Sequence, residues 1–209
     1  MKNQQRAIID PKTVYFCVDL EASGRVPGLF NMVSIGGVAV QYDHGVHRRG
    51  GEFYFELQPI CDGFDPHAMS IHGLTEDHLR THGLPARLVM EKITDWVKTN
   101  TPDGYRPLFV GHNAPFDWMF TAWYFAWAGL DNPFGYNALD TKALMMGTQR
   151  LPWRQCNKET LTEVYPELRP PAPDRVHNAL ADAQFQADIL IALLDGNAPN
   201  RRVSSDGPS

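Results

Sequence analysis

The stretch Tyr15-Phe-Cys-Val-Asp-Leu-Glu21 places two carboxylates directly after a short apolar run. Because the apolar residues lack helical spacing, the run predicts a buried strand near the centre of a sheet. Side chains of a strand alternate between its faces, so Asp19 and Glu21 leave the same face, within about 7 Å of each other. Two like charges about 4 Å apart repel by roughly 4 kcal/mol at an effective dielectric constant near 20, a cost that a divalent cation would turn into attraction. An isolated pair of this kind more often caps a strand at the surface, so its interpretation depends on further carboxylates.

The composition is that of one ordinary globular domain, with 209 residues, of which 43% are hydrophobic and 21% charged. A net charge of −5 argues against a protein that coats duplex DNA, but not against an enzyme that grips a few nucleotides through bound metal. Cys17, Cys61 and Cys156 lack C-x-x-C spacing and are interpreted as reduced thiols. Without a signal-like run or 18 consecutive apolar residues, the expected location is the cytoplasm, away from membranes.

The order of predicted elements indicates an α/β domain. Strands at 15–21, 31–42 and 51–57 follow one another through short connections, so they should be antiparallel neighbours. Helices and strands then alternate, which favours a mixed five-stranded sheet, three antiparallel strands then parallel ones, flanked by helices. The later elements are a helix begun by Thr75, a helix at 85–100, a strand at 107–111, a helix at 115–129, a strand at 136–139, a helix capped by Asp140, a helix at 158–165, and a helix from His177 or Asn178 to Leu194. Residues 12–195 would form the domain, between a flexible N-terminus at 1–11 and a disordered tail at 196–209.

Two further acids follow later elements of the predicted domain. Asp117 ends the run Gly111-His-Asn-Ala-Pro-Phe-Asp117 and lies in the first turn of a helix, near where a neighbouring strand would deliver Asp19. The helix dipole alone is a sufficient reason for an acid there. Asp182 lies beside the apolar stripe of the last helix and should be partly buried, which is rare for an aspartate that is neither paired nor bound to metal. His177 precedes it by five residues and can reach over the same site.

Together these motifs resemble the DEDDh (DnaQ-like) 3'-5' exonucleases. Asp-x-Glu on the first strand, His-Asn-x-x-Phe-Asp after the fourth and His-x4-Asp on the last helix stand in the order of that family, over roughly 13–194. The family has an RNase H-like fold and includes polymerase proofreading domains, oligoribonuclease and ribonuclease T. The segments 132–134 and 139–144 are most similar to ribonuclease T, whereas Asp-Leu-Glu is nearer to oligoribonuclease.

The resemblance implies hydrolysis from the 3' end of single-stranded nucleic acid, with RNA slightly favoured over DNA, releasing 5'-mononucleotides. Two divalent ions would assist the attacking and leaving oxygens, and oxygen ligands favour Mg²⁺ or Mn²⁺. By the same resemblance Asp19 bridges the two ions, while Glu21 and Asp182 hold the ion that binds the attacking water. Asp117 would serve the leaving-group ion. His177 would take the proton of the water, since imidazole has a reference pKa of about 6.5.

The resemblance also implies substrate contacts around this centre. Phe116 would stack on a base, worth roughly 1–3 kcal/mol, although packing in the core is an equally good reason for it. Arg25 stands where ribonuclease T has another stacking aromatic, so that contact departs from the pattern. The expected substrate-binding residues are Leu20 and Ala22 near the terminal sugar, Ile71 and His72 in the base pocket, and Asn113 and Phe116 before Asp117.

Several other features have simpler interpretations. The basic residues at 150–154, with Lys158, Arg169 and Arg175, could guide a strand, but neighbouring acids favour a solvated loop. His78 and His82 are interpreted as surface histidines. The aromatic helix 116–127 should be largely buried, with one side available to a partner, and a homodimer is an expectation of the resemblance.

Two other functions remain alternatives. One is a catalytically silent nucleic-acid-binding or polymerase-associated adaptor on the same fold, which would release no nucleotides. The other is an RNase H-like endonuclease, which would cut circular substrates.

Overall fold

The computed structural model describes residues 8–172 and 177–196. Of the predicted flexible ends, 1–7 and 197–209 lie outside the described residues. The described chain begins in contact with the domain, since the Ile8 N–H donates a hydrogen bond of 2.7 Å to the Leu194 carbonyl.

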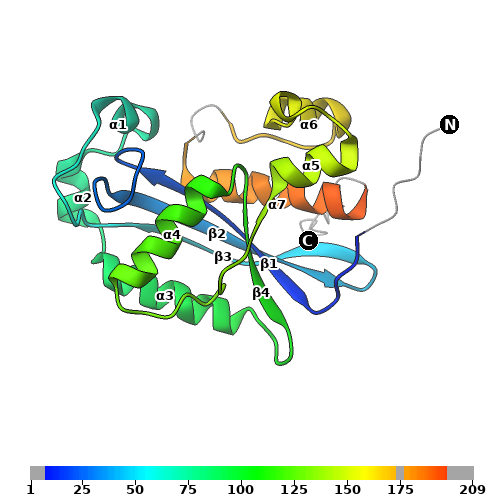
Figure 1. The fold of residues 1–209 in the computed structure, drawn as a ribbon, viewed down its shortest axis with the longest axis horizontal. Coiled ribbons are helices and arrows are strands. Elements are labelled where there is room, and N and C mark those ends of the chain that lie inside the picture. The colour runs from blue at the N-terminus through cyan, green and yellow to red at the C-terminus, as the bar shows by residue number, and fades with distance from the viewer. Residues whose placement is uncertain (1–7, 173–176, 197–209) are drawn as a thin grey trace, which may run out of the picture.

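The centre of the fold is a five-stranded sheet in the order β3-β2-β1-β4-β5 (Figure 1). β1 pairs antiparallel with β2, and β2 with β3, whereas β1 with β4 and β4 with β5 are parallel. This confirms the predicted mixed sheet. The strands are β1 (Thr13–Ala22), β2 (Met32–Asp43), β3 (Val46–Glu56), β4 (Arg106–Gly111) and β5 (Ala138–Asp140).

Two strand boundaries differ from the prediction. β3 begins earlier than residue 51, because its polar first half pairs with β2. Side-chain ion pairs stabilise this half, such as the one between Arg49 and Asp188 at 2.5 Å. β5 starts later than residue 136, and the Tyr136 side chain is 96% exposed. Hydrophobic alternation cannot detect the first half of β3, because this half is polar. At the start of β5 the sequence predicts a strand from Tyr136, but the strand begins only at Ala138.

The helices begin largely where their caps predict. The side chains of Thr75, Asp140 and Asn178 each accept a backbone N–H in the first turn of the following helix. α1 was not predicted, because it is short and buries no residue. The helices are α1 (Pro66–His72), α2 (Glu76–His82), α3 (Ala86–Thr99), α4 (Pro115–Trp127), α5 (Thr141–Gln149), α6 (Lys158–Val164) and α7 (Ala179–Asp195), with a 3₁₀ turn at Trp153–Gln155.

The two faces of β1 pack against different helices. Phe16, Val18 and Leu20 belong to a cluster shared with α3 and α4, whereas Tyr15 and Cys17 pack against α7. The remaining side of α7 packs against α5 and α6, so this helix is buried along most of its length. Because Asp19 and Glu21 continue the face of Tyr15 and Cys17, the alternation places both carboxylates on the α7 side.

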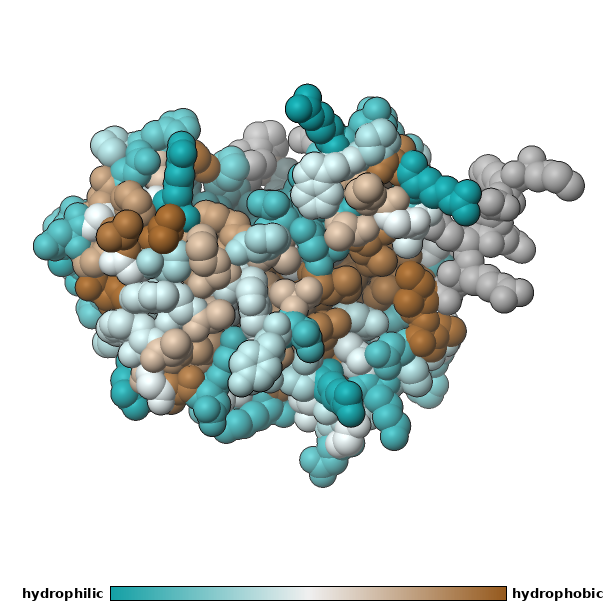
Figure 2. Space-filling model, in the orientation of Figure 1, coloured by the Kyte–Doolittle hydropathy of each residue, from teal (hydrophilic) through white to brown (hydrophobic). Residues whose placement is uncertain are grey.

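The surface is mixed in hydropathy, with apolar side chains over the loop that follows β1 (Figure 2). Val26 and Leu29 of this loop are exposed, as are Met119 and Trp127 of α4, whereas Phe120 and Tyr124 of that helix are fully buried. Homodimer formation stays a prediction. Across 8–172 and 177–196, none of the helices combines the length and hydrophobicity that a membrane crossing requires.

Gly36 allows the first turn of α7 to lie directly on the sheet. It is the partner of Asp19 in the β1–β2 ladder, and a Cβ at this position would lie 2.5 Å from the backbone nitrogen and Cα of Leu180. Neither atom belongs to a flexible side chain, so a larger residue would have to displace the helix. The close approach therefore sets the position of the helix that carries Asp182.

We expect Gly36→Ala to lower the free energy of unfolding by about 1–3 kcal/mol, because the added methyl group overpacks a backbone contact. Gly50→Ala on β3 is the matched control, since its Cβ would meet the nearest atoms, in Ala39, at an ordinary 3.7 Å. Urea denaturation of both variants measures the difference. Equal stability of the two variants would contradict the proposed role of the contact.

Candidate active site

Asp117 completes the hydrogen bonding of β1 at the point where β4 leaves it. The parallel ladder of β1 and β4 ends at Cys17 and Val110, yet β1 continues to Ala22. The chain turns after β4 into α4, and Asp117 in the first turn of α4 accepts the Leu20 N–H at 3.2 Å. A side-chain oxygen thus takes the place of the missing strand partner. Asp117, which is 6% exposed, therefore lies close to Asp19. It does so although α4 packs on the face of the sheet opposite α7.

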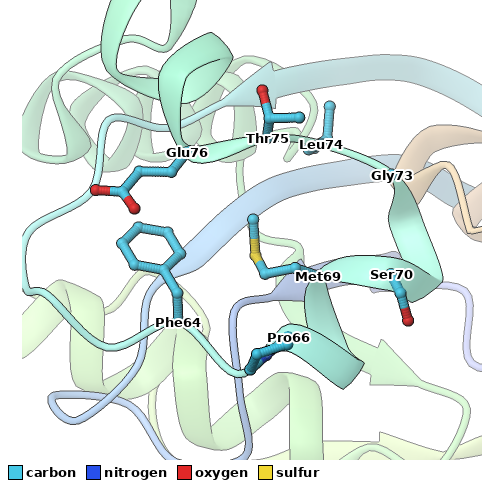
Figure 3. A pocket seen from close by; sticks show the side chains of 8 residues that line it. All are labelled: Phe64, Pro66, Met69, Ser70, Gly73, Leu74, Thr75 and Glu76. Atoms are coloured by element: carbon cyan, nitrogen blue, oxygen red, sulfur yellow. The ribbon is translucent and has the colours of Figure 1, made fainter.

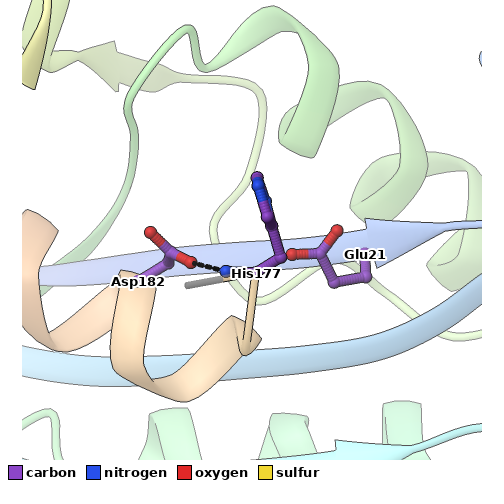
Figure 4. Close-up of side chains that lie close together, drawn as sticks. All are labelled: Glu21, His177 and Asp182. Atoms are coloured by element: carbon purple, nitrogen blue, oxygen red, sulfur yellow. Dashed lines mark hydrogen bonds between the residues drawn. The ribbon is translucent and has the colours of Figure 1, made fainter. Parts of the chain in front are cut away.

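Asp182 and His177 are positioned by the start of α7. Asn178 caps the helix, and Asp182 lies in its first turn, 8% exposed. One Asp182 oxygen accepts the His177 backbone N–H at 2.9 Å, drawn as a dashed line in Figure 4. His177 has the left-handed φ of 63°, a conformation that histidine adopts more readily than most residues. Its imidazole is exposed, and ligand atoms of Glu21, His177 and Asp182 all lie within 4.8 Å of one another.

Burial makes the ionised form of these carboxylates unfavourable. It raises the pKa of Asp19 to about 7, an effect that the Lys158 ammonium opposes and the Asp182 charge reinforces. Burial, followed by repulsion from Asp19 and Asp182, raises the pKa of Glu21 to about 9. The pKa of Asp117 is also raised, by burial and then by Asp19. The protein therefore brings together the four predicted acids in a site that favours bound positive charge.

Lys158 is a residue of this site that sequence reasoning missed. It was assigned to a solvated basic loop, but its ammonium contacts an Asp182 oxygen at 2.7 Å. Burial lowers the pKa of Lys158, but the charges of Asp19 and Asp182 outweigh this effect and raise it overall. No local pattern could reveal the contact, because it depends on where α6 packs against α7.

Gln186 is a second residue that the sequence did not single out. It is fully buried on α7, and in the amide orientation that satisfies both groups it donates to the Val18 carbonyl at 3.2 Å and accepts the His112 N–H. His112 directly follows β4, and burial lowers the pKa of its imidazole to about 4. Gln186 therefore joins β1 to the chain after β4 beside the end of their ladder.

The residues expected near the terminal sugar offer only their backbone. The side chains of Leu20 and Ala22 are buried in the cluster with α3 and α4. The Leu20 N–H is already bonded to Asp117. His72 lies near the Ala22 backbone and His177, and burial lowers its pKa. This places the end of α1 beside the carboxylates.

The residues before Asp117 have mixed environments. Phe116 is half-buried, with its ring 5.2 Å from that of Phe120. Asn113 is exposed, and its N–H donates to Asp140 at 3.1 Å. Asp140 thus caps α5 and also holds the turn before α4, in agreement with its assignment as a cap.

An open pocket of about 400 Å³ lies between α1 and α2 (Figure 3). Gly73 to Thr75, which directly follow the expected base-pocket residues Ile71 and His72, contribute to its wall. Ile71 and His72 are not among its lining residues, and Ile71 is 44% exposed. The complete lining is Phe64, Pro66, Met69, Ser70, Gly73, Leu74, Thr75 and Glu76.

The donor set suits a hard divalent cation. Carboxylate oxygens dominate it, which favours Mg²⁺ or Mn²⁺, and one imidazole stands at its edge. Glu21, His177 and Asp182 are close enough to share one ion, and the half-buried Asp19 and the buried Asp117 lie next to them. The unfavourable burial of these acids is relieved by such a charge, so the residues fit the metal that the motifs imply.

Comparison with known structures identifies the fold as that of the RNase H-like DEDDh exonucleases. The nuclease domain of 3'hExo, a DEDDh family member bound to rAMP, has a TM-score of 0.69 at 16% identity, over 88% of this chain and 93% of that one. A 3'-exonuclease that recognises the 3' end of a histone mRNA stem-loop has a TM-score of 0.74 at 15% identity, over 91% and 85%. Zinc-bound Escherichia coli ExoI with single-stranded DNA has a TM-score of 0.66 at 19% identity, over 88% and 40%.

The chain belongs to the family of 3'-5' exoribonuclease Rv2179c-like domains, whose profile matches residues 14–194. The 3'-5' DNA exonuclease Cap18 of Escherichia coli is 34% identical over 192 residues, which cover 92% of this chain and 97% of the relative. The protein is therefore a 3'-5' exonuclease, a hydrolase that acts on nucleic acid. The predicted relationship to the DEDDh family is confirmed.

The raised pKa values predict that the metal-free protein loses stability as pH rises. The pKa of Asp19 is about 7 and that of Glu21 about 9 in the folded state, against ordinary values of 3.8 and 4.5. Between the ordinary and raised values the folded chain holds protons that the unfolded chain releases, so each unit of pH lowers the free energy of unfolding. A divalent cation at this site would need the ionised carboxylates, so we expect the increase in Tm that Mg²⁺ causes to grow from pH 6 to pH 9.

Thermal denaturation in EDTA and in Mg²⁺ across this pH range tests the prediction. The double variant Asp19→Asn with Glu21→Gln is the control, because it lacks two of the titrating carboxylates and its response to Mg²⁺ should depend less on pH. An Mg²⁺-induced shift that is the same at every pH in the parent protein would contradict the assignment.

Proposed function

We propose that this exonuclease removes 5'-mononucleotides from the free 3' end of single-stranded RNA with the help of two Mg²⁺ or Mn²⁺ ions. The observation that carries the proposal is the convergence of four acids in one group. The half-buried Asp19 and Glu21 come from β1, and the buried Asp117 and Asp182 come from α4 and α7. His177 stands exposed at its edge. These residues are far apart in the chain. Bringing their charges together away from water is unfavourable, and a bound cation would offset that free energy.

In this proposal the carboxylates of Asp19, Glu21, Asp117 and Asp182 would hold the ions. Such a pair of ions, when bound, stabilises the attacking and leaving oxygens of an in-line displacement at phosphorus. The hydrogen bond from the Leu20 N–H fixes Asp117, and that from the His177 N–H fixes Asp182. The backbone thus orients two of the acids before substrate arrives, and little reorganisation is needed during the reaction.

His177 takes the proton of the attacking water. Its imidazole nitrogen lies within 4.8 Å of carboxylate oxygens of Glu21 and Asp182, and the side chain is open to solvent. Asp182 holds the His177 backbone, so the base and a metal ligand are positioned together. General base catalysis of this kind contributes about 10²–10⁴-fold to a rate.

We expect His177→Ala to lower kcat by at least about 100-fold while divalent-ion and substrate affinity stay near the parent values. His177→Asn is the companion variant, because asparagine tolerates the left-handed backbone and separates loss of the base from backbone strain. His82→Ala, at an exposed histidine of α2, should remain fully active. Steady-state cleavage and calorimetric Mn²⁺ titration measure the two properties; parent-like turnover in both His177 variants would exclude this base.

RNA is the proposed substrate because the family is one of exoribonucleases and the motifs are most similar to ribonuclease T and oligoribonuclease. DNA is the second candidate, since the 34% identical relative is a DNA exonuclease. Discrimination requires a contact with the 2'-hydroxyl. One such hydrogen bond is worth about 1 kcal/mol, so we expect kcat/KM for RNA to exceed that for DNA by roughly fivefold to tenfold.

Digestion of matched 5'-labelled RNA and DNA oligonucleotides tests the substrate and the direction together. The expected result is a ladder shortened from the 3'-hydroxyl end, faster on RNA, with 5'-mononucleotides released only when Mg²⁺ or Mn²⁺ is present. Substrates ending in a 3'-phosphate measure the requirement for a free 3' end. Faster digestion of DNA would reverse the proposed preference, absence of any release would favour the adaptor, and cutting of a circular strand would favour the endonuclease.

A further inference from the structure

Lys158 occupies a position that an isolated helix would not favour. It is the first residue of α6, where the helix dipole is positive and a cation is destabilising. Its ammonium nevertheless lies 2.7 Å from an Asp182 oxygen, and its side chain is only 29% exposed. Within 8–172 and 177–196, no other lysine or arginine nitrogen lies within 4.0 Å of the four site carboxylates. The carboxylates, and not the helix, therefore account for where this charge lies.

The backbone that carries Lys158 is anchored independently of the ammonium. Asn157 caps α6 by accepting the Thr160 N–H at 2.8 Å, and Leu161 of the same helix is fully buried in the cluster with α5 and α7. The lysine side chain has several rotatable bonds, so its ammonium can leave the site while α6 stays in place. The Lys158 ammonium can therefore change position without any movement of α6.

We propose that Lys158 is a built-in counter-ion of the carboxylate group that stabilises the metal-free site and that divalent ions must displace. The inference rests on the proposed metal-dependent function. Mg²⁺ approaches a carboxylate oxygen to about 2.1 Å, and the Asp182 oxygen in question already accepts a bond from the ammonium. Two cations on the same oxygen repel each other, so the lysine and the metal bind in competition. Linkage then requires that Lys158 weakens metal affinity and that bound metal releases Lys158.

Lys158→Gln tests the competition, with Lys98→Gln as a control that removes one exposed positive charge from α3. In EDTA we expect Lys158→Gln to lower Tm by about 3–6 °C, because the carboxylates lose their counter-ion, and saturating Mn²⁺ should abolish the difference. Calorimetric titration should show Mn²⁺ binding about fivefold to fiftyfold tighter in Lys158→Gln than in the parent. Lys98→Gln should match the parent in both measurements.

Lys158→Arg keeps the charge and provides the decisive comparison if the glutamine variant folds poorly without metal. It should bind Mn²⁺ within about twofold of the parent, since a cation still competes. Unchanged Mn²⁺ affinity and unchanged metal-free Tm in Lys158→Gln would overturn the inference. Weaker Mn²⁺ binding in Lys158→Gln would also overturn it, because the lysine would then support Asp182 as a ligand. Arginine and glutamine variants that bind Mn²⁺ equally tightly would exclude a role for the charge.

Cleavage of labelled RNA by the parent protein, measured in the same Mn²⁺ buffer, separates this inference from the proposed function. If the parent releases nucleotides while Lys158→Gln binds Mn²⁺ with parent affinity, the counter-ion role fails and the nuclease function stands. If Lys158→Gln binds Mn²⁺ more tightly while the parent releases no nucleotides, the counter-ion role stands and the proposed function fails.

Discussion

The burial of several carboxylates at one end of β1 is the constraint on which the rest of the site depends. Removing charge from water is unfavourable, and here the repulsion between neighbouring acids adds to that cost. Part of the cost is offset by backbone N–H groups, which bond to Asp117 and Asp182. The remainder is reduced by protons and by Lys158 in the metal-free protein. The site therefore requires positive charge, and this requirement is what makes it suitable for hard cations.

The sheet provides the place where these acids can meet. β4 separates from β1 after Cys17 and Val110, and β1 continues into Asp19 and Glu21 paired with β2 but no longer with β4. Asp117 accepts the Leu20 N–H from the α4 side, and Gln186 links β1 to the segment after β4 from the α7 side. Helices on opposite faces of the sheet thus contribute to one site, because both α4 and α7 begin beside the end of the β1–β4 ladder.

The parts of the site that local rules control could be predicted from the sequence. Alternation along β1 places Asp19 and Glu21 on one face, and capping residues such as Asp140 mark where helices begin. Order of the motifs then identified the family. The position of Lys158 could not be predicted, because it arises from the packing of α6 on α7, and a lysine in a polar stretch normally indicates solvent. The role of the buried Gln186 also depends on tertiary packing, because its partners are Val18 within β1 and His112 directly after β4.

The hydrogen bond between Asp117 and the Leu20 N–H has a practical consequence for trapping a substrate complex. Removing the Asp117 carboxylate would leave a buried N–H of the central strand without a partner and disturb the chain that carries Asp19. A crystallographer who seeks an inert protein with an undistorted cleft should therefore leave this aspartate in place. The exposed imidazole of His177 is the better choice, because the hydrogen bond from this residue to Asp182 is made by its backbone N–H and survives the substitution.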